Sequence, residues 1–183
     1  GIATRTRAFV ERARGGPRVV SGGWKKMPAA LKEMIRSAVA TGGGQSRILP
    51  GPFVYLDKNY VELLGGVRDA LAAVAHLGDV AKVVQVKGRR VDLAAEACAA
   101  AEHGATVVFV DTGRAEDVAW ATGALARRGL RGRVQVAFGG GVTLEDVDGL
   151  RRLDVDILDV GRQIVDAPLL DLRLDVVEVR RTE

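Results

Sequence analysis

The sequence predicts an α/β fold, a parallel (β/α) barrel of about six to seven strands, from three observations. Strand-like and helix-like segments alternate about six times along the chain. The strand segments are mostly apolar and the loops are short, which is typical of a parallel sheet covered by helices. The glycine runs come late, at Gly139–Gly141 and Gly161, whereas an open dinucleotide-binding sheet carries its glycine fingerprint after the first strand. This placement favours a barrel over a doubly wound sheet.

Each expected element has a local reason. Helical segments show apolar residues with a helical period, and they cover residues 3–14, 28–40, 67–77, 92–103 and 115–128. Strand segments are rich in β-branched residues, and they cover residues 18–21, 53–56, 80–87, 106–110, a run around 134–136, and 155–160. Pro28 suits the first position of a helix.

Two further elements are expected near the C-terminus. Thr143 is placed to be the N-cap of a helix that carries Glu145 and Asp146 in its first turn. The segment Leu172–Val179 is expected to form one last strand.

Length and composition predict one soluble domain covering residues 1–183, with 48% hydrophobic and 27% charged residues. No run of 18 apolar residues occurs, so we expect no membrane partner. A single cysteine and no signal-peptide pattern indicate a cytoplasmic location. The net charge of +4 comes from scattered arginines, and aromatics are only 4%, so we expect no nucleic-acid partner.

Polar residues and glycines collect where the expected strands end, which is where parallel α/β folds place their sites. They are Lys25, Lys26, Asp57, Lys58, Gln85, Lys87, Asp111, Gly139–Gly141 and Gly161. Two glycine-bearing strand ends present backbone N–H groups without side chains, an arrangement that suits a phosphate. The alternative is that the glycines only form tight turns and the lysines only face solvent.

On these residues the chain resembles the quinolinate phosphoribosyltransferase (nicotinate-nucleotide pyrophosphorylase) family. The similar motifs follow in order: Ile2–Val10 at the first helix, Gly23-Trp24-Lys25-Lys26-Met27-Pro28, Gly42–Arg47, Asp57-Lys58-Asn59-Tyr60, Val84-Gln85-Val86, Val110-Asp111-Thr112, Gly139–Thr143, and Val160-Gly161 followed by Ala167-Pro168 and Leu170-Asp171. The resemblance covers nearly the whole chain and implies a barrel of the type II phosphoribosyltransferase kind. It covers the barrel domain only, so we expect the family's N-terminal domain to be absent from this chain.

The resemblance implies a transferase that binds phosphoribosyl pyrophosphate and a nitrogen heterocycle, in NAD biosynthesis. It implies that Lys25, Lys58 and Asp111 are catalytic, with Mg²⁺ held by Asp111. It implies substrate binding by Trp24, Arg47, Gln85, Gly140, Gly141 and Gly161. The expected partners are a small phosphorylated substrate and either a second copy of the chain or a separate N-terminal-domain partner.

The chain departs from the family at polar positions. An Arg is replaced by Trp24, a His by Ser46, a Lys by Asp57, a Glu by Gln85 and a late His by Val165. Losing cations is unfavourable for a buried dicarboxylate, because an unpaired buried charge costs several kcal/mol. Trp24 therefore suggests a flatter, less anionic acceptor stacked on the indole, unless the ring only packs.

Two other functions remain open from the sequence. A diverged paralogue that binds a phosphorylated ligand without catalysis would explain the clustered substitutions. A lyase or aldolase would use Lys58 or Lys87 as a Schiff base.

Overall fold

The computed structural model describes residues 1–180 of the chain. The strands are β1 (Arg18–Val20), β2 (Phe53–Leu56), β3 (Ala81–Val86), β4 (Val107–Asp111), β5 (Gln135–Gly139) and β6 (Ile157–Asp159). The helices are α1 (Ile2–Arg12), α2 (Ala29–Thr41), α3 (Lys58–Leu63), α4 (Val67–Ala73), α5 (Leu93–Glu102), α6 (Ala115–Arg127), α7 (Val147–Leu150) and α8 (Arg162–Val165). Short 3-10 helices cover Gly23–Lys26, Ala75–Leu77 and Arg131–Arg133.

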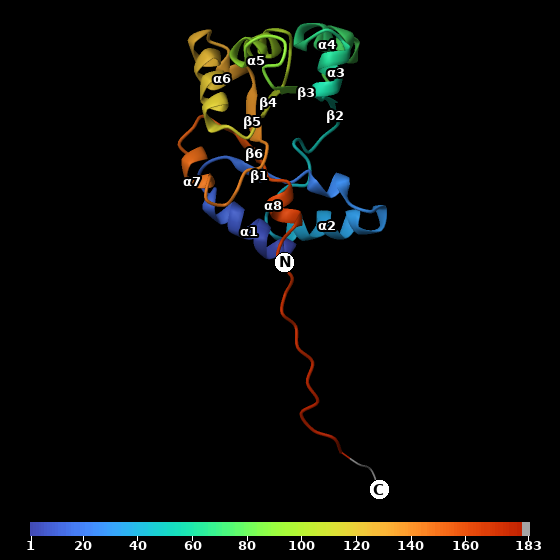
Figure 1. Cartoon of the computed structure of the whole chain (residues 1–183). Helices are drawn as coiled ribbons and strands as arrows, with labels where there is room; N and C mark the ends of the chain where they lie inside the picture. The colour runs from blue at the N-terminus through green and yellow to red at the C-terminus, as the bar shows by residue number, and fades with distance from the viewer. Residues whose placement is uncertain (181–183) are drawn as a thin grey trace.

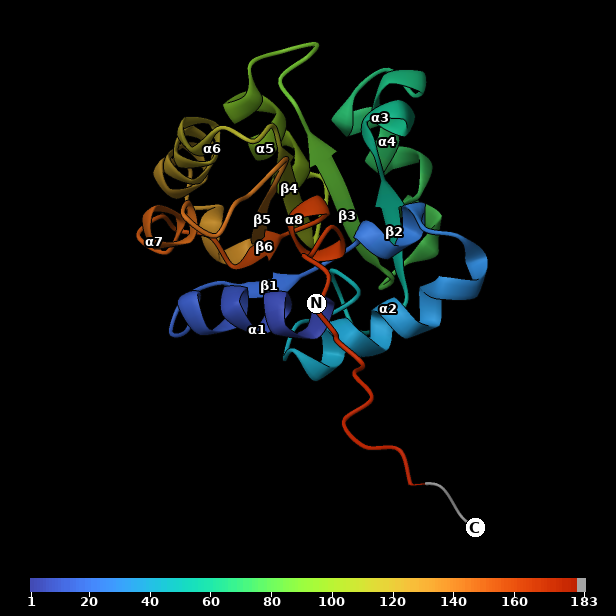
Figure 2. The ribbon, with the colours of Figure 1, turned by 60° about the horizontal axis from the view of Figure 1, so that its bottom comes forward.

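All six strands form one parallel sheet in the order β1-β6-β5-β4-β3-β2. The larger helices lie around the sheet, with α1 and α2 on one side and α3 to α6 on the other (Figures 1 and 2). The predicted α/β barrel class is confirmed by this arrangement.

The sheet curls, because its two edge strands contribute to the same interior cluster. Val20 of β1 and Tyr55 of β2 both belong to a small core that includes Phe109 of β4. The segment before β2 also pairs with β1: the Ser21 N–H donates to the Gln45 carbonyl at 2.8 Å. The interior of the barrel is therefore a packed core, as is usual for small parallel barrels.

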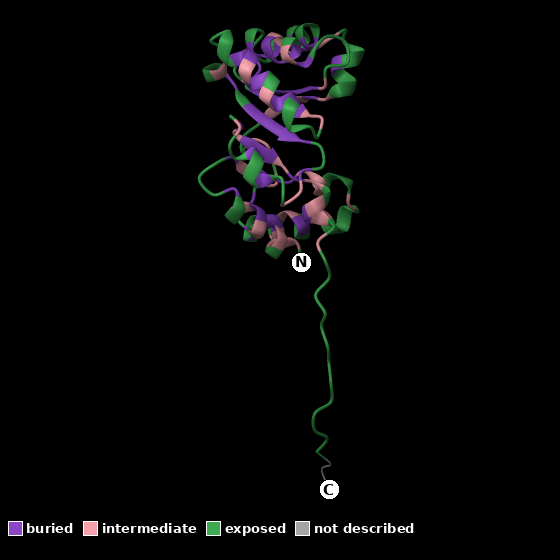
Figure 3. Ribbon diagram, turned by 60° about the vertical axis from the view of Figure 1, so that its left-hand side comes forward, coloured by how far each residue is buried: buried purple, intermediate pink, exposed green. Residues whose placement is uncertain are grey.

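A larger core lies between the outer face of the sheet and the helices. Val84, Val108 and Val136 face it from the centre of the sheet and are fully buried. Figure 3 shows the strands buried and the helices buried along one side only. This one-sided burial agrees with the helical period of the apolar residues in the sequence.

The structure corrects two expected elements near the C-terminus. Thr143 is not an N-cap; its N–H and hydroxyl both donate to Asp146 at 2.8 Å, and the helix that follows is only α7. Leu172–Val179 forms no strand; this segment leads away from the body of the molecule without pairing to the sheet (Figure 1). Its alternation of apolar and polar residues satisfies the strand pattern, but a strand also needs a neighbour.

The sequence also missed two short helices, α3 and α8, that follow strand ends. Each has six residues or fewer, too short for a helical period to show in the sequence. Between residues 1 and 180, no helix is both long and apolar enough to cross a bilayer.

Gly42 allows a close approach of α2 to α1 and provides a test of this packing. A Cβ at Gly42 would lie 2.5 Å from both the Ala3 carbonyl oxygen and the Thr6 Cβ. We predict that Gly42→Ala lowers the free energy of unfolding by about 1–3 kcal/mol, as overpacking does. Urea denaturation would measure the loss. Gly51→Ala is the control, since a Cβ at Gly51 meets no described atom within 4 Å; equal stability of the two variants would contradict the prediction.

Candidate functional site

The largest cavity at the carboxyl ends of the strands has a volume of about 590 Å³. Tyr55 and Phe109 line it from the barrel interior, with ring centroids 6.4 Å apart. Asp111 follows Phe109 by two residues on β4, and Asp159 ends β6. Side chains two residues apart on a strand face the same way. Because Phe109 and Ile157 face the barrel interior, Asp111 and Asp159 face it as well.

Five of the sequence-predicted site residues converge on this cavity: Lys25, Asp111, Gly140, Gly141 and Gly161. They come from the ends of four strands that are consecutive neighbours in the sheet, β1, β6, β5 and β4. The Lys25 ammonium lies 5.5 Å from the centroid of the Tyr55 ring, within the range of a cation–π contact.

Gly140 holds the loop after β5 in a conformation open only to glycine. Its φ is +106°, and a Cβ there would lie 2.5 Å from the Gly113 nitrogen of the neighbouring loop. By contrast, a Cβ on Gly161 would meet no described atom within 4 Å. The glycine at 161 thus leaves space beside the backbone, whereas the glycine at 140 is required by the fold.

Trp24 and Arg47 line a neighbouring cavity of about 370 Å³ instead, which shares only Lys25 with the main one. The indole N–H of Trp24 donates to the Ser46 carbonyl at 2.8 Å, and the Arg36 guanidinium lies 5.1 Å from the ring centroid. The indole thus packs against protein groups and also borders a cavity, so stacking of an acceptor on Trp24 stays a prediction.

Lys58 and Gln85 border a third, very small cavity beside β3. Asp57, at a position where the resemblance implies a lysine, caps α3 by accepting from the Asn59 and Tyr60 N–H groups at 2.8 and 3.0 Å. Val165, where the resemblance implies a histidine, lines the main cavity with an apolar side chain.

Asp111 is surrounded by hydrogen-bond donors. Its Oδ2 accepts from the Gln85 side-chain amide and forms an ion pair with the Lys87 ammonium at 3.2 Å. Lys87 also donates to the Asp111 carbonyl. The Gln85 amide oxygen in turn accepts from the Lys58 N–H at 2.8 Å. Within residues 1–180, no group of three or more His, Cys, Asp or Glu residues is arranged to hold a metal ion. The Mg²⁺ ion expected at Asp111 stays a prediction.

Asp159 and Tyr55 are cavity residues that the sequence reasoning missed. The Gly22 N–H donates to Asp159 Oδ1 at 3.2 Å. Burial raises the pKa of Asp159 above its ordinary value, which the Gly22 hydrogen bond and the Lys25 charge only partly oppose. Burial also raises the pKa of the Tyr55 phenol, with further contributions from the carboxylates of Asp159 and Asp111. Tyr55 is therefore a neutral hydrogen-bond donor at physiological pH.

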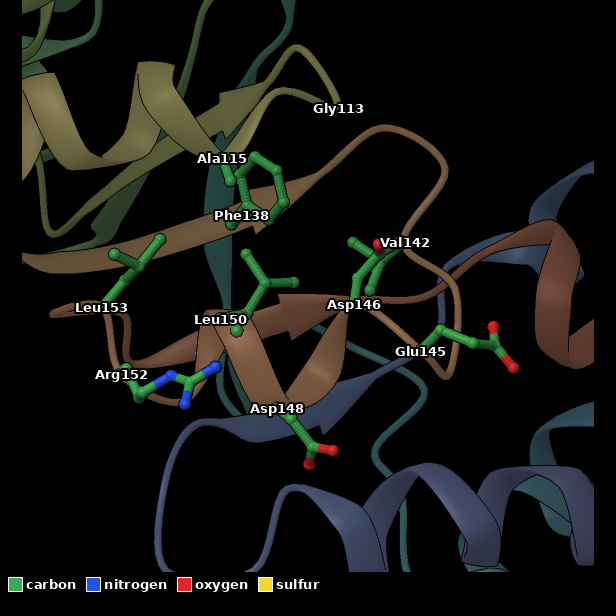
Figure 4. Close-up of a pocket in the computed structure, with 11 residues that line it drawn as sticks. Gly113, Ala115, Phe138, Val142, Glu145, Asp146, Asp148, Leu150, Arg152 and Leu153 are labelled. Carbon is green, nitrogen blue, oxygen red and sulfur yellow. The ribbon is translucent and has the colours of Figure 1, made fainter.

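A further cavity of about 530 Å³ lies between β5 and α7, and none of the predicted catalytic or binding residues lines it. Phe138, Leu150 and Leu153 gather on its apolar side, whereas Glu145 and Asp148 point away from them (Figure 4). Since α7 has four residues, it covers the sheet less completely than the longer helices do.

The fold and the cavity define a parallel α/β barrel with its candidate site at the carboxyl ends of the strands. Residues 2–175 match the model of the family described as "Quinolinate phosphoribosyl transferase, C-terminal domain". The chain belongs to this family, which confirms the resemblance predicted from its motifs.

The relatives that the chain matches are longer than the chain itself. The chain is 33% identical over 180 residues to a probable nicotinate-nucleotide pyrophosphorylase [carboxylating] of Archaeoglobus fulgidus, covering 97% of this chain and 67% of that protein. It is 30% identical over 176 residues to the human nicotinate-nucleotide pyrophosphorylase [carboxylating], covering 95% and 58%. The crystal structure of the nicotinate-nucleotide pyrophosphorylase from Pyrococcus furiosus has a TM-score of 0.75 at 24% identity, covering 91% and 47%, and supports the fold.

The raised pKa of Asp159 predicts how its replacement changes stability with pH. A raised carboxyl pKa means that the folded state holds the proton of this group more tightly than the unfolded state does. The contribution of Asp159 to stability is therefore full at low pH and is lost as pH rises through the folded-state pKa. Asp159→Asn should therefore raise the melting temperature at pH 7, and the difference from wild type should shrink below about pH 4.

Thermal melts at the two pH values would measure this difference. Asp79→Asn removes an exposed carboxylate outside the main cavity and controls for the change in net charge. A lower melting temperature for Asp159→Asn at both pH values would contradict the prediction.

Proposed function

We propose that the main cavity binds a phosphoribosyl group and that the protein is a phosphoribosyltransferase of the nicotinate-nucleotide pyrophosphorylase type, acting in NAD biosynthesis. The observation that carries the proposal is the convergence of Gly140, Gly141 and Gly161 with Lys25 and Asp111 on one cavity. Backbone at the glycines is accessible to a phosphate, and the lysine supplies charge. The names of the relatives from Archaeoglobus fulgidus and human agree with this class of reaction.

In the proposed reaction, a heterocycle nitrogen attacks the ribose C1 while the bond from C1 to the pyrophosphate oxygen breaks. Pyrophosphate leaves with the electron pair, and positive charge develops on the ribose ring. Lys25 neutralises the leaving group, and the carboxylate of Asp111 accepts hydrogen bonds from ribose hydroxyls. Gly140, Gly141 and Gly161 hold the 5′-phosphate. Lys58 is exposed and borders the small cavity beside β3. Its ammonium can contact the leaving group only if the side chain extends into the main cavity.

The acceptor in this proposal is less anionic than a dicarboxylate. The cavity is lined by three cationic side chains and three carboxylates, namely Lys25, Lys26, Arg162, Asp111, Asp159 and Asp166. These charges nearly cancel, and the phosphates of the ribosyl donor already require the cations. A neutral nitrogen heterocycle, able to accept from Tyr55, suits the remaining space better than a doubly charged one.

A second candidate, a phosphate-binding protein without catalysis, is favoured by the changes at polar positions. The indole N–H of Trp24 is bonded to the Ser46 carbonyl, and the carboxylate of Asp57 is bonded to the α3 backbone, so neither polar group replaces the lost cation at a ligand. The Schiff-base alternative is less well supported, because the Lys87 ammonium is paired with Asp111 and Lys58 is exposed.

Ligand binding tests the proposal, and Gly161 is a suitable position because an added methyl group there meets no described atom within 4 Å. Phosphoribosyl pyrophosphate at millimolar concentration should raise the melting temperature of the wild type, because a ligand that binds only the folded state stabilises it. Gly161→Ala should reduce that shift while melting like wild type without ligand, since its methyl group enters open space beside the backbone. Lys25→Met should also reduce the shift, and Lys32→Met, outside the lining of this cavity, should not. Absence of a shift for wild type would contradict the proposal.

Pyrophosphate release separates the enzyme from the binding protein. Wild type is incubated with phosphoribosyl pyrophosphate and a panel of neutral, monocarboxylate and dicarboxylate pyridines, with and without Mg²⁺. We expect pyrophosphate release with a neutral or monocarboxylate acceptor. The rate of release with the dicarboxylate should be at least about tenfold lower. Binding without release for every acceptor would favour the non-catalytic protein.

A further inference from the structure

The side chain of Gln85 is held in one orientation by the backbone. The Lys58 N–H can only donate, and it points to one end of the Gln85 amide at 2.8 Å. That end must therefore be the oxygen, so the NH₂ group faces Asp111. Gln85 is 7% exposed, so solvent offers few alternative partners. The amide oxygen, the only atom of this side chain that could ligate a hard cation, is directed away from the carboxylate.

Lys87 adds a full positive charge on the same side of Asp111. Its ammonium pairs with Oδ2 of the carboxylate at 3.2 Å and also donates to the Asp111 carbonyl. The side chains of Lys87 and Asp111 are 23% and 26% exposed, so the pair is partly screened from solvent. The oxygen facing Gln85 and Lys87 thus already has two donors.

Magnesium requires a different environment. It takes oxygen ligands in octahedral geometry, commonly one or two carboxylates with waters and substrate phosphates. Beside Asp111 the structure places an amide NH₂ and an ammonium, which present hydrogens rather than lone pairs. The residues between β3 and β4 therefore do not fit a divalent metal.

We propose that the Lys87 ammonium takes the place of a divalent metal in this site, so that a phosphate ligand binds without Mg²⁺. The proposal rests on the proposed function in that it assumes a phosphate-bearing ligand in the main cavity. Lys87 neutralises Asp111, which otherwise would repel the phosphates across the cavity. Lys87 borders the small cavity beside β3 and acts on the ligand through Asp111, whereas Lys25 supplies positive charge in the main cavity itself.

Metal binding is the first test, and it is independent of any phosphate ligand. Mn²⁺ accepts the same oxygen ligands as Mg²⁺ and can be followed by its electron paramagnetic resonance signal. Wild type should show no saturable Mn²⁺ site. The double variant Gln85→Glu with Lys87→Met should gain one, and adding Asp111→Asn should remove it. A Mn²⁺ site in wild type that Asp111→Asn abolishes would overturn the proposal, even if the double variant failed to fold.

The second test uses inorganic pyrophosphate in calorimetric titrations, with EDTA or with saturating free Mg²⁺. The wild-type Kd should differ by less than about threefold between the two conditions. Lys87→Met should bind about tenfold more weakly in EDTA, because the carboxylate of Asp111 then faces the pyrophosphate without its paired cation. Lys32→Met is the matched control and should bind like wild type.

The two tests distinguish failure of the inference from failure of the proposed function. Wild-type binding that is more than about tenfold tighter with Mg²⁺ would overturn the role of Lys87 and leave phosphate binding intact. No pyrophosphate binding in either condition would instead contradict the proposed function, and the Mn²⁺ measurement would still decide whether Lys87 excludes a metal.

Discussion

The packing of β1 and β2 into one interior cluster is the constraint on which the rest of the structure depends. These strands are the opposite edges of the sheet, and Val20 and Tyr55 can share a core only if the sheet curls. The curl brings the carboxyl ends of the two edge strands toward one another, so that residues from both edges border the same cavity. Lys25, which follows β1, and Tyr55 of β2 then line one cavity, with the ammonium 5.5 Å from the ring centroid. An open, flat sheet of the same strands would leave these two residues at opposite edges.

Interior side chains approach β5 closely at Gly139, and this close approach places the charged groups beside it. A Cβ at Gly139 would lie 2.9 Å from the Phe109 ring and 3.3 Å from the Asp159 Cβ. Glycine at this position leaves room for Asp159 beside the ring, in a surrounding that raises the pKa of its carboxyl group. Asp111 lies on β4 opposite Gly139 in the sheet register. The missing side chain thus brings two carboxylates toward one another, and each lies near a lysine, Lys25 for Asp159 and Lys87 for Asp111.

The sequence predicted the β/α alternation and the strand ends well, because both depend on local patterns. β2 was predicted with the bounds that the structure shows, and the order of glycines and lysines identified much of the cavity lining. Asp159 was missed although the signal was present: Ile157 faces inward, so the residue two positions later does too. The partners of Trp24 and Gln85 could not be predicted, since they depend on backbone groups brought near by the tertiary fold.

The change from Glu to Gln at position 85 is best understood together with Lys87. A glutamate there would place a second carboxylate against Asp111, and two neighbouring carboxylates favour a bound cation or a shared proton. Glutamine removes that charge, and its NH₂ group becomes a donor to Asp111 because the Lys58 N–H fixes the amide. The ammonium of Lys87 then balances the remaining carboxylate from within the chain. The glutamine amide and the lysine ammonium together hold Asp111 Oδ2 in one position from within the chain.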